Sequence, residues 1–346
     1  MNINLLSGSS LADAIPRLTK YACAGARSHP SRNPMWMYVL KEGLGHVPYA
    51  LEAVDGGRTV GYLPLVFVRS TLFGRFLVSL PYLNTGGVIA DTDDAKADLI
   101  SQAVELGNRL RTRHVELRHE VPVTHASLNG TRGSKVHMRL ELPSFPGPLW
   151  ESFPAKVRNQ VRKGEKSGLT THWGTFDLLP EFYQVFSTNM RDLGTPVYSQ
   201  NLFRSMLRHF RGHAELCVLR HEGIAVSGAV LVHGKGITEV PSASTLRSAN
   251  NLSANMLMYW NLLDRTVQRG QSVFDFGRAT KDGNTYKFKK QWGAVESPAV
   301  WQYALHGAAA NLRTDNPTYA KIIKLWQRLP VPVTRMIGPA IVRGIP

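Results

Sequence analysis

The chain has 346 residues, which suggests two domains at roughly 150 residues each. Hydrophobic residues make up 43% and charged residues 19% of the chain, a composition that excludes global disorder. The 41 lysines and arginines against 25 acidic residues give a net charge of +16. This charge favours an anionic partner, without choosing between nucleic acid, a phosphorylated carrier, an anionic polymer and a membrane surface.

The cysteines and the N-terminus indicate a reducing compartment. Cys23 and Cys217 cannot form a disulfide framework. The first residues lack the charged start and unbroken apolar stretch of a secretory signal. The longest apolar run, Tyr62–Val68, is far shorter than the roughly 20 residues that span a bilayer. A cytoplasmic protein is predicted, with peripheral contact at the inner face of the membrane left open.

In the first half, strands are predicted over 49–54 and 59–68, because they flank the hairpin signal Asp55-Gly56-Gly57. A helix over 94–111 and a strand over 114–118 follow. The Pro- and Gly-rich segment Leu142–Pro148 then interrupts the pattern of helices and strands, and it is the predicted domain boundary. We therefore expect an N-terminal domain over 1–143, a second domain over 144–310 and a basic tail over 311–346.

The second half repeats the hairpin pattern. Strands over 214–220 and 224–233 flank Glu222-Gly223, and a further short strand follows at 236–240. Helices are predicted over 153–167, 200–210 and 254–269 from their apolar spacing and their Ser and Gly ends. Alternating helices and strands with short connections indicate an α/β or α+β fold. The two similar hairpins are a weak hint of an internal duplication.

The helix over 153–167 is strongly basic. Arg158, Arg162 and Lys166 are spaced at i, i+4 and i+8 and share one face, with Lys156 and Lys163 beside them. These cations repel each other, so phosphates or a polyanion are expected to neutralise them, and arginine suits a bidentate grip. The alternative is a solvated surface helix.

The predicted strand Ser272–Phe276 carries one carboxylate, Asp275, in an otherwise apolar run. Burying it costs free energy unless it is paired. Its position at a strand end, before a loop expected from Gly277, is where α/β folds place reactive groups. The alternative is a structural ion pair with Arg278 or Lys281.

Two further segments mix cations with aromatic residues. Tyr286–Gly293 (YKFKKQWG) suits phosphate binding together with stacking on a base or sugar; an exposed amphipathic strand or helix end is the alternative. No acidic residue follows Asp315, and an amphipathic helix with Trp326 is predicted over 318–329 before Pro330. Such a helix can lie on an anionic membrane surface, or pack on the protein itself.

The sequence lacks the motifs of several common catalytic and binding sites. The sequence has no H-E-x-x-H zinc motif, no G-K-[ST] phosphate loop, no G-x-S-x-G elbow and no G-x-G-x-x-G after a strand. The histidines are scattered and cysteines are few, so no metal site is predicted.

In combination, these segments resemble a known family. In chain order they are SRNPMW, PYLNTGG, AKVRNQVRKGEKSG, RDLGTPVYSQNLF, GIAVSGAVLV, SANMLMYWNLLDRTVQRG, VFDFGRAT and YKFKKQWGA. The set is similar to the FemAB-like branch of the GNAT acyltransferase superfamily. It most resembles the FemAB-related proteins associated with exosortase (PEP-CTERM) and exopolysaccharide gene clusters of Gram-negative bacteria. The resemblance covers nearly the whole chain.

The resemblance implies two tandem GNAT-like acyltransferase domains, each a mixed sheet flanked by helices. It implies N-acyl transfer without a metal or a tightly bound cofactor, with acyl-CoA or aminoacyl-tRNA as the co-substrate. In the peptidoglycan-bridge members, an aminoacyl-tRNA donates an amino acid to an amine, and a Phe-Lys pair sits at the reaction centre. Phe288-Lys289 matches that pair by its spacing to Trp292-Gly293.

Roles follow from this match and from position. Lys289 is expected to stabilise the oxyanion or the leaving group, Asp275 to act as a base or orient the amine, and Tyr198 to give a proton to the leaving group. Arg158 and Arg162 are expected to hold phosphate, and Arg278 to orient Asp275. The full set predicted to bind substrate or donor is Arg158, Arg162, Lys163, Arg278 and Phe288.

Two departures from the family leave the donor open. The chain has no recognisable Q/R-x-x-G-x-G/A loop for the pyrophosphate of coenzyme A, and no helical coiled-coil insertion of the kind some bridge-forming members carry.

The leading hypothesis is an N-acyltransferase that acts on an amine of a cell-envelope or exopolysaccharide precursor, an anionic small molecule or lipid-linked substrate. The alternative is a non-catalytic binding protein for an anionic polymer or RNA. A third hypothesis is a membrane-surface assembly factor anchored by residues 318–329.

Overall fold

The computed structural model describes residues 1–25, 28–305 and 317–345. The chain divides into two compact units. Unit 1 contains Met1–Val136, Ser297–Arg313 and Ala340–Pro346, and unit 2 contains His137–Glu296 and Thr314–Pro339. The boundary predicted between residues 310 and 311 lies outside the described residues, and the domain limits proposed from the sequence stay predictions.

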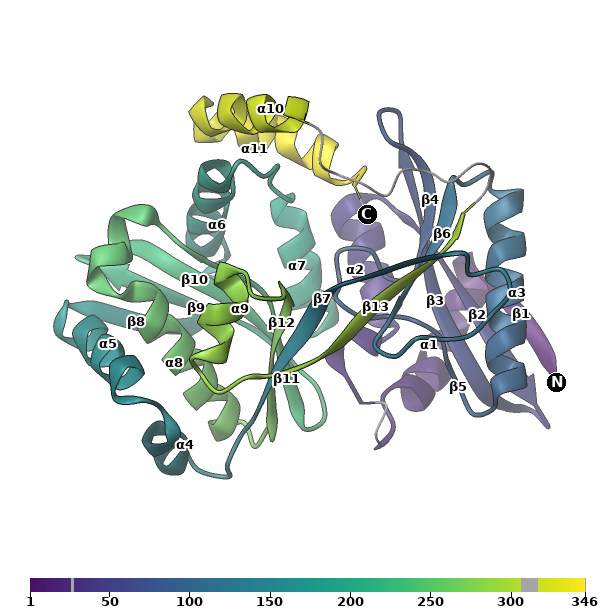
Figure 1. Cartoon of the computed structure of the whole chain (residues 1–346), viewed down its shortest axis with the longest axis horizontal. Coiled ribbons are helices and arrows are strands. Elements are labelled where there is room, and N and C mark those ends of the chain that lie inside the picture. Colours follow the sequence, from purple (N-terminus) through teal and green to yellow (C-terminus); the bar gives the residue numbers. More distant parts are fainter. Residues whose placement is uncertain (26–27, 306–316, 346) are drawn as a thin grey trace. The chain divides into compact units, whose positions relative to one another are not determined.

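Unit 1 begins with a strand and two helices, and continues with antiparallel strands, a long helix and a further strand (Figure 1). Its elements are β1 (Asn2–Leu6), α1 (Gly8–Ala22), the 3-10 turn η2 (Pro30–Arg32), α2 (Met35–Leu44), β2 (Val47–Asp55), β3 (Arg58–Ser70), β4 (Gly74–Val78), β5 (Ile89–Ala90), α3 (Asp93–Arg109) and β6 (His114–His119). Strand β13 (Val295–Leu305) returns to this unit late in the chain.

The strands of unit 1 form a mixed sheet in the order β1-β2-β3-β4-β6-β13, with β5 paired to β3. All neighbours are antiparallel except β4 and β6, which are parallel. Different helices pack on the two faces of this sheet. Leu51 belongs to an apolar cluster with Leu99 of α3, whereas its neighbour Glu52 accepts hydrogen bonds from Arg17 of α1. Because side chains alternate along a strand, α1 and α3 cover opposite faces.

Unit 2 has a longer series of elements. They are α4 (Pro146–Ser152), α5 (Ala155–Lys166), β8 (Leu169–Gly174), α6 (Leu179–Leu193), α7 (Gln200–His209), β9 (Ala214–His221), β10 (Ile224–His233), β11 (Ile237–Thr245), η3 (Arg247–Leu252), α8 (Ala254–Gln268), β12 (Val273–Thr280), α9 (Asn284–Lys290), α10 (Pro317–Arg328) and α11 (Val331–Val342). Strand β7 (Gly130–Glu141) and helix α11 each cross the boundary between the units.

The sheet of unit 2 has the order β7-β12-β11-β10-β9-β8. Helices cover both of its faces (Figure 1). A Cβ on Gly228 of β10 would lie 3.2 Å from Phe182 of α6, whereas the hydroxyl of the adjacent Ser227 contacts Met258 of α8. Helices α6 and α8 therefore pack on opposite faces of the sheet.

The two units share one topology. In unit 1, β1, β2, β3 and β4 are antiparallel neighbours in chain order, and α3 then leads to the parallel strand β6. In unit 2, β8, β9, β10 and β11 repeat this order, and α8 leads to the parallel strand β12. The duplication suggested by the two hairpins is thus present in the fold.

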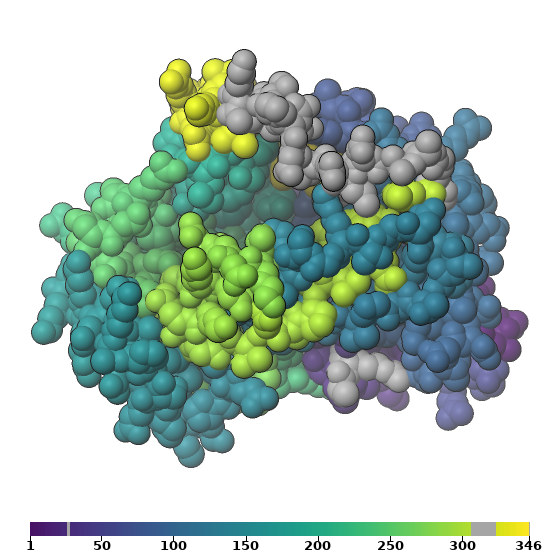
Figure 2. Space-filling model, viewed as in Figure 1, coloured from purple at the N-terminus to yellow at the C-terminus, as the bar shows by residue number. Residues whose placement is uncertain are grey.

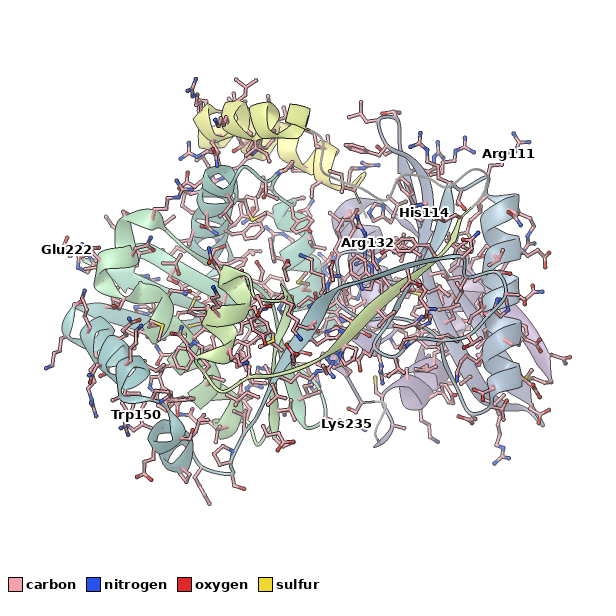
Figure 3. All side chains as sticks on the ribbon, in the orientation of Figure 1. Arg111, His114, Arg132, Trp150, Glu222 and Lys235 are labelled. Carbon is pink, nitrogen blue, oxygen red and sulfur yellow. The ribbon has the colours of Figure 1, made fainter. Side chains whose placement is uncertain are left out.

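Most predicted elements are found within one or two residues of their expected ends. The hairpin turns use positive φ as expected: Gly56 and Gly57 have φ of 52° and 76°, and Gly223 has φ of 81°. Glu222 beside it lies at the end of the β9–β10 hairpin, away from the centre of unit 2 (Figure 3). These turns lie between regular antiparallel strands, which explains why local sequence was sufficient to find them.

One local prediction is wrong, and two other predicted segments differ in detail. The segment Leu142–Pro148, predicted as the domain boundary, contains the start of helix α4 at Pro146, because proline is well suited to the first turn of a helix. The predicted helix over 153–167 starts only at Ala155, since Phe153 has extended backbone and ends α4. The loop expected from Gly277 is instead strand, and β12 continues to Thr280.

The C-terminal helix predicted over 318–329 is α10, and α11 follows directly after Pro330. Helix α10 packs on the C-terminal end of α6. Gln327 donates a hydrogen bond to the carbonyl of Asp192 at 3.0 Å, and Arg191 donates to the carbonyl of Leu329 at 3.0 Å. Trp326 is buried. Membrane contact through this helix stays a prediction. Among the described residues, no helix is both long and apolar enough to cross a bilayer.

Candidate functional site

The central feature of unit 2 is a fork between two parallel strands. β11 and β12 pair only at Ile237–Val273, Thr238–Phe274 and Glu239–Asp275. Both strands continue well beyond this point, to Thr245 and Thr280, without pairing to each other in the part of the chain that the structure describes. The facing edges of the two strands therefore offer backbone donors and acceptors to an extended ligand. The fork opens toward the carboxyl ends of the parallel strands, where α/β folds bind ligands.

Two carboxylates lie where the fork begins. Glu239 and Asp275 are paired in the parallel register and are only 2% and 1% exposed. Phe276 stacks on Tyr259 of α8, with ring centroids 5.7 Å apart. Since side chains alternate along β12, Asp275 faces the α6 side of the sheet. Two acidic groups this deeply buried require compensating donors.

Asp275 receives such donors from two directions. Its Oδ2 accepts a hydrogen bond from Nε of Arg139 on β7 at 2.8 Å, and its Oδ1 accepts from the backbone N–H of Gly277 at 2.6 Å. Asp275 thus forms an ion pair with Arg139, whereas the sequence analysis named Arg278 or Lys281 as the partner. Of the partners considered there, Lys281 instead pairs with Glu296 at 2.8 Å.

Lys289 is buried although it carries a charge, with 5% of its surface exposed. Its Nζ donates a hydrogen bond to the carbonyl oxygen of Arg278 on β12 at 2.8 Å. This bond ties α9 to the strand that carries Asp275. Because it involves only the backbone of Arg278, the role expected for the Arg278 side chain stays a prediction. Helix α9 itself lies at the surface of unit 2 (Figure 2).

Phe288 belongs to an aromatic layer on the α8 side of the sheet. Its ring centroid lies 4.9 Å from that of Tyr259 and 6.4 Å from that of Trp292. Burial raises the pKa of Tyr259 to about 12, so its phenol stays protonated at neutral pH. Trp292 is completely buried, and its Nε1–H has no hydrogen-bond partner among the described residues. The layer supports α9 through apolar packing.

The basic helix α5 packs along α8. A Cβ on Gly164 would lie 2.8 Å from Cβ of Leu257, so only glycine allows this approach. Arg162 is exposed, and its guanidinium lies 5.5 Å from the ring centroid of Trp150 on α4, which Figure 3 labels. Lys163 is exposed. Arg158 is half-buried, and its Nε has no hydrogen-bond partner in the described structure. The helix therefore presents guanidinium and ammonium groups that can donate hydrogen bonds to an anionic ligand.

Tyr198 lies in the loop between α6 and α7. Its ring stacks on Phe186 of α6 with centroids 6.3 Å apart, and its carbonyl accepts a hydrogen bond from the hydroxyl of Tyr183 at 3.0 Å. Tyr198 is therefore on the same side of the sheet as Asp275, whereas Phe288 and α5 pack against α8 on the other side. The predicted residues thus form two groups, separated by the sheet.

Sequence reasoning missed three residues of this arrangement. Arg139 lies in the largely apolar segment VHMRLEL, which also carries His137 and Glu141, and Glu239 follows a short apolar run in GITEVP. A charged residue within an apolar strand is the signal that identified Asp275. Tyr259 could not be recognised from the sequence, because an aromatic residue at helical spacing is typical of the hydrophobic core.

The comparisons with known proteins agree with this geometry. Residues 151–290 match the model of the acetyltransferase (GNAT) domain family. This segment of unit 2 is therefore similar to acetyltransferase (GNAT) domains. It contains α5, the fork, Asp275 and Lys289, so the candidate site lies within the matched segment. The match does not extend to unit 1. No curated protein sequence matches the chain.

Solved structures with the same fold cover nearly the whole chain. The chain is similar to FemX with a TM-score of 0.67 and 14% identity, covering 93% of this chain and all of FemX. It is similar to the C-terminal domain of a lysylphosphatidylglycerol synthetase from Agrobacterium fabrum with a TM-score of 0.57 and 12% identity, covering 86% and 93%. A tandem GNAT protein of clavulanic acid biosynthesis gives 0.55 and 11% identity, covering 89% and 100%.

The predicted fold class, tandem GNAT-like domains with mixed sheets flanked by helices, is confirmed by these matches and by the repeated topology of the two units.

Proposed function

We propose that the protein is an N-acyltransferase that moves an acyl or aminoacyl group from an activated donor to an amine on a cell-envelope or exopolysaccharide precursor. The observation that carries the proposal is the fork between β11 and β12, with two buried carboxylates at its base and a buried lysine fixed to one of its strands. A charged cluster that a fold buries at the end of parallel strands is typical of a site that does chemistry.

The reaction joins the amine nitrogen of the acceptor to the carbonyl carbon of the donor. An oxyanion forms on the carbonyl oxygen, and the Lys289 ammonium stabilises it. The attacking nitrogen gives up a proton, which Glu239 or Asp275 accepts. The bond to the leaving group then breaks, and Tyr198 supplies the proton that the leaving group needs. The two carboxylates and Tyr198 share the α6 side of the sheet, which supports these roles.

Asp275 suits orientation of the amine better than proton removal. One of its oxygens is held by Arg139 and the other by the Gly277 N–H, while a carboxylate has about four acceptor positions in all. These two donors fix the direction of the carboxylate and stabilise its charged form, which makes it a weaker base. Glu239, beside it in the register, is our candidate for the base.

The donor would bind along the fork and α5. An extended pantetheine arm or a tRNA acceptor end can use the unpaired strand edges, while Arg158, Arg162 and Lys163 face the phosphates that both donors carry. The acceptor class rests on the family resemblance and on the names of two similar folds, FemX and the lysylphosphatidylglycerol synthetase.

The test is direct. Purified protein is titrated with acetyl-CoA, with longer acyl-CoAs, and with charged and uncharged tRNA, at a fixed salt concentration of about 150 mM, because a strongly cationic protein binds any polyanion in dilute buffer. The same titrations use the variant Arg158→Gln/Arg162→Gln. Arg204→Gln/Arg211→Gln, which removes two exposed charges elsewhere in unit 2, is the matched control.

Saturable binding of one donor class that the first variant loses and the control retains supports the proposal and names the donor. Equal binding of every polyanion, with no preference for charged over uncharged tRNA, rejects it in favour of the non-catalytic binding protein.

A further inference from the structure

A separate cavity in unit 1 is lined by arginines. It has a volume of about 450 Å³ and lies between the start of β2 and the β3–β4 hairpin, against the C-terminal segment. Three arginines line it, Arg69, Arg75 and Arg343, together with His46 and Ser70. No carboxylate is among its lining residues. The proposed reaction uses none of these residues.

Two of the arginines face each other across the β3–β4 ladder. Arg69 and Arg75 are direct partners in the antiparallel register. Like charges in this position destabilise a hairpin, because the side chains project from neighbouring points on the same face. Neither guanidinium forms an ion pair with a carboxylate in the described structure. The hairpin thus holds two uncompensated charges against the wall of a cavity.

The third arginine, Arg343, lies in a segment that is fixed by a hydrogen bond to its backbone carbonyl. The guanidinium of Arg343 lies about 4 Å from the position a Cβ on Gly45 would take, so it packs against the turn that ends α2. The hydroxyl of Tyr82 donates to the carbonyl of Arg343 at 2.8 Å, and therefore accepts from Nε2–H of His46, which lies 3.0 Å away. Burial and the nearby Arg343 lower the pKa of His46 to about 4, so the imidazole is neutral.

A hydroxyl adds a further donor. Oγ of Ser70 accepts the N–H groups of Leu72 and Phe73 at 3.3 and 3.1 Å, which orders the hairpin turn. Its own hydrogen has no acceptor among the described residues. The cavity therefore combines three guanidinium groups, one free hydroxyl hydrogen and no acid, which is the donor set that a phosphate group requires.

We propose that this cavity of unit 1 binds the phosphate or diphosphate group of a ligand. The source is a soluble phosphorylated molecule or the headgroup of a lipid. Leu72, at the tip of the hairpin, is 74% exposed, and Ile345, two residues after Arg343, is 44% exposed. Exposed apolar residues beside a phosphate site suit contact with a lipid, so the experiment includes both sources.

The experiment uses the full-length protein and inorganic pyrophosphate as the probe. Binding is measured by calorimetry at about 150 mM salt, and the melting temperature is recorded with and without pyrophosphate. The test variant is Arg69→Gln/Arg75→Gln. The matched control is Arg58→Gln/Arg111→Gln, which removes two exposed arginines of unit 1 outside the cavity. Arg111 projects outward beyond the end of α3 (Figure 3).

We expect saturable binding to the wild type, a loss of about 100-fold in the test variant, roughly tenfold for each charge-assisted contact, and no more than about a twofold change in the control. The test variant should fold at least as well as the wild type, because it removes a like-charge pair. Equal losses in both variants would show non-specific charge attraction and overturn the proposal, as would no measurable binding.

Vesicles distinguish the two sources. Phosphatidylcholine vesicles with and without phosphatidic acid are floated with wild type, Arg69→Gln/Arg75→Gln and Leu72→Ser. Retention that needs phosphatidic acid, the arginines and Leu72 assigns the cavity to a lipid headgroup. Pyrophosphate binding without such retention assigns it to a soluble ligand. Both readouts are independent of acyl transfer, so the cavity and the proposed function fail or stand separately.

Discussion

The Nε atom of Arg139 lies 2.8 Å from Oδ2 of Asp275, and this ion pair joins β7 to β12 in unit 2. The carboxylate is 1% exposed at its side chain, whereas the arginine is 25% exposed. The arginine thus compensates part of the charge of the buried carboxylate, together with the Gly277 N–H, and the arginine itself contacts solvent. We therefore expect removal of Arg139 and removal of Asp275 to change the free energy of unfolding by different amounts.

We expect Arg139→Met to lower the free energy of unfolding by about 3 kcal/mol, because it leaves a buried carboxylate without its cation. Asp275→Asn should cost less, about 1 to 2 kcal/mol, since Arg139 can turn toward water. The double variant should recover part of the loss. Urea unfolding of the four proteins measures the coupling. If the two single effects simply add, the pair makes no stabilising contribution of its own.

Lys289→Met should reduce acyl transfer by about 10² to 10³ in kcat, with little change in KM, because the ammonium is assigned to the oxyanion rather than to substrate binding. Lys287→Met, in the same helix but exposed, is the control for the loss of one charge. Far-UV circular dichroism verifies that both variants are folded. Unchanged turnover in Lys289→Met would remove this residue from the mechanism.

The protein should lose stability below neutral pH through His119. Its Nδ1 lies 2.9 Å from Oε1 of Gln302, and its Nε2 is buried without a partner. Burial lowers its pKa to about 4, so between about pH 6.5 and 4 the unfolded chain binds a proton that the folded one does not. The free energy of unfolding should fall by about 2 kcal/mol from pH 7 to pH 5 for this group, and stop falling below pH 4.

His119→Asn keeps a donor for Gln302 and cannot be protonated. The slope of unfolding free energy against pH, measured by urea titration at several pH values, should therefore be smaller in this variant. His46, whose pKa is also lowered to about 4, accounts for part of the slope that remains. An identical slope in wild type and variant would contradict the assignment to His119.

Gly164→Ala tests the contact between α5 and α8. Alanine favours a helix by about 1 kcal/mol over glycine, but its Cβ would lie 2.8 Å from Cβ of Leu257. We expect the steric clash to outweigh the gain in helix propensity, with a net loss of about 1 to 2 kcal/mol in the free energy of unfolding. Donor binding should also weaken, because α5 carries Arg158 and Arg162. Glu165→Ala, an exposed change in the same helix, is the control. A stabilised Gly164→Ala would show that α5 can move away freely.

The local sequence determined the elements that have strong local signals. The glycine turns of both hairpins, the cap at Ser199 before α7 and the end of α8 before Gly270 follow from φ preferences and capping, which depend on a few neighbouring residues. The alternation in VFDFG placed Asp275 and Phe276 on opposite faces, as the contact of Phe276 with Tyr259 confirms. The family resemblance, carried by motifs together, led to the correct fold class.

Only the tertiary structure decided which charges meet. Arg139 and Asp275 are 136 positions apart, and no local pattern relates strands that pair through long connections. The same holds for the fork, because the register of β11 on β12 depends on α8, which crosses between them. Arg343 reaches the turn at Gly45 for the same reason. Local preferences fix turns and faces, whereas strand order brings distant charges into contact, and in this protein the candidate sites are made from such contacts.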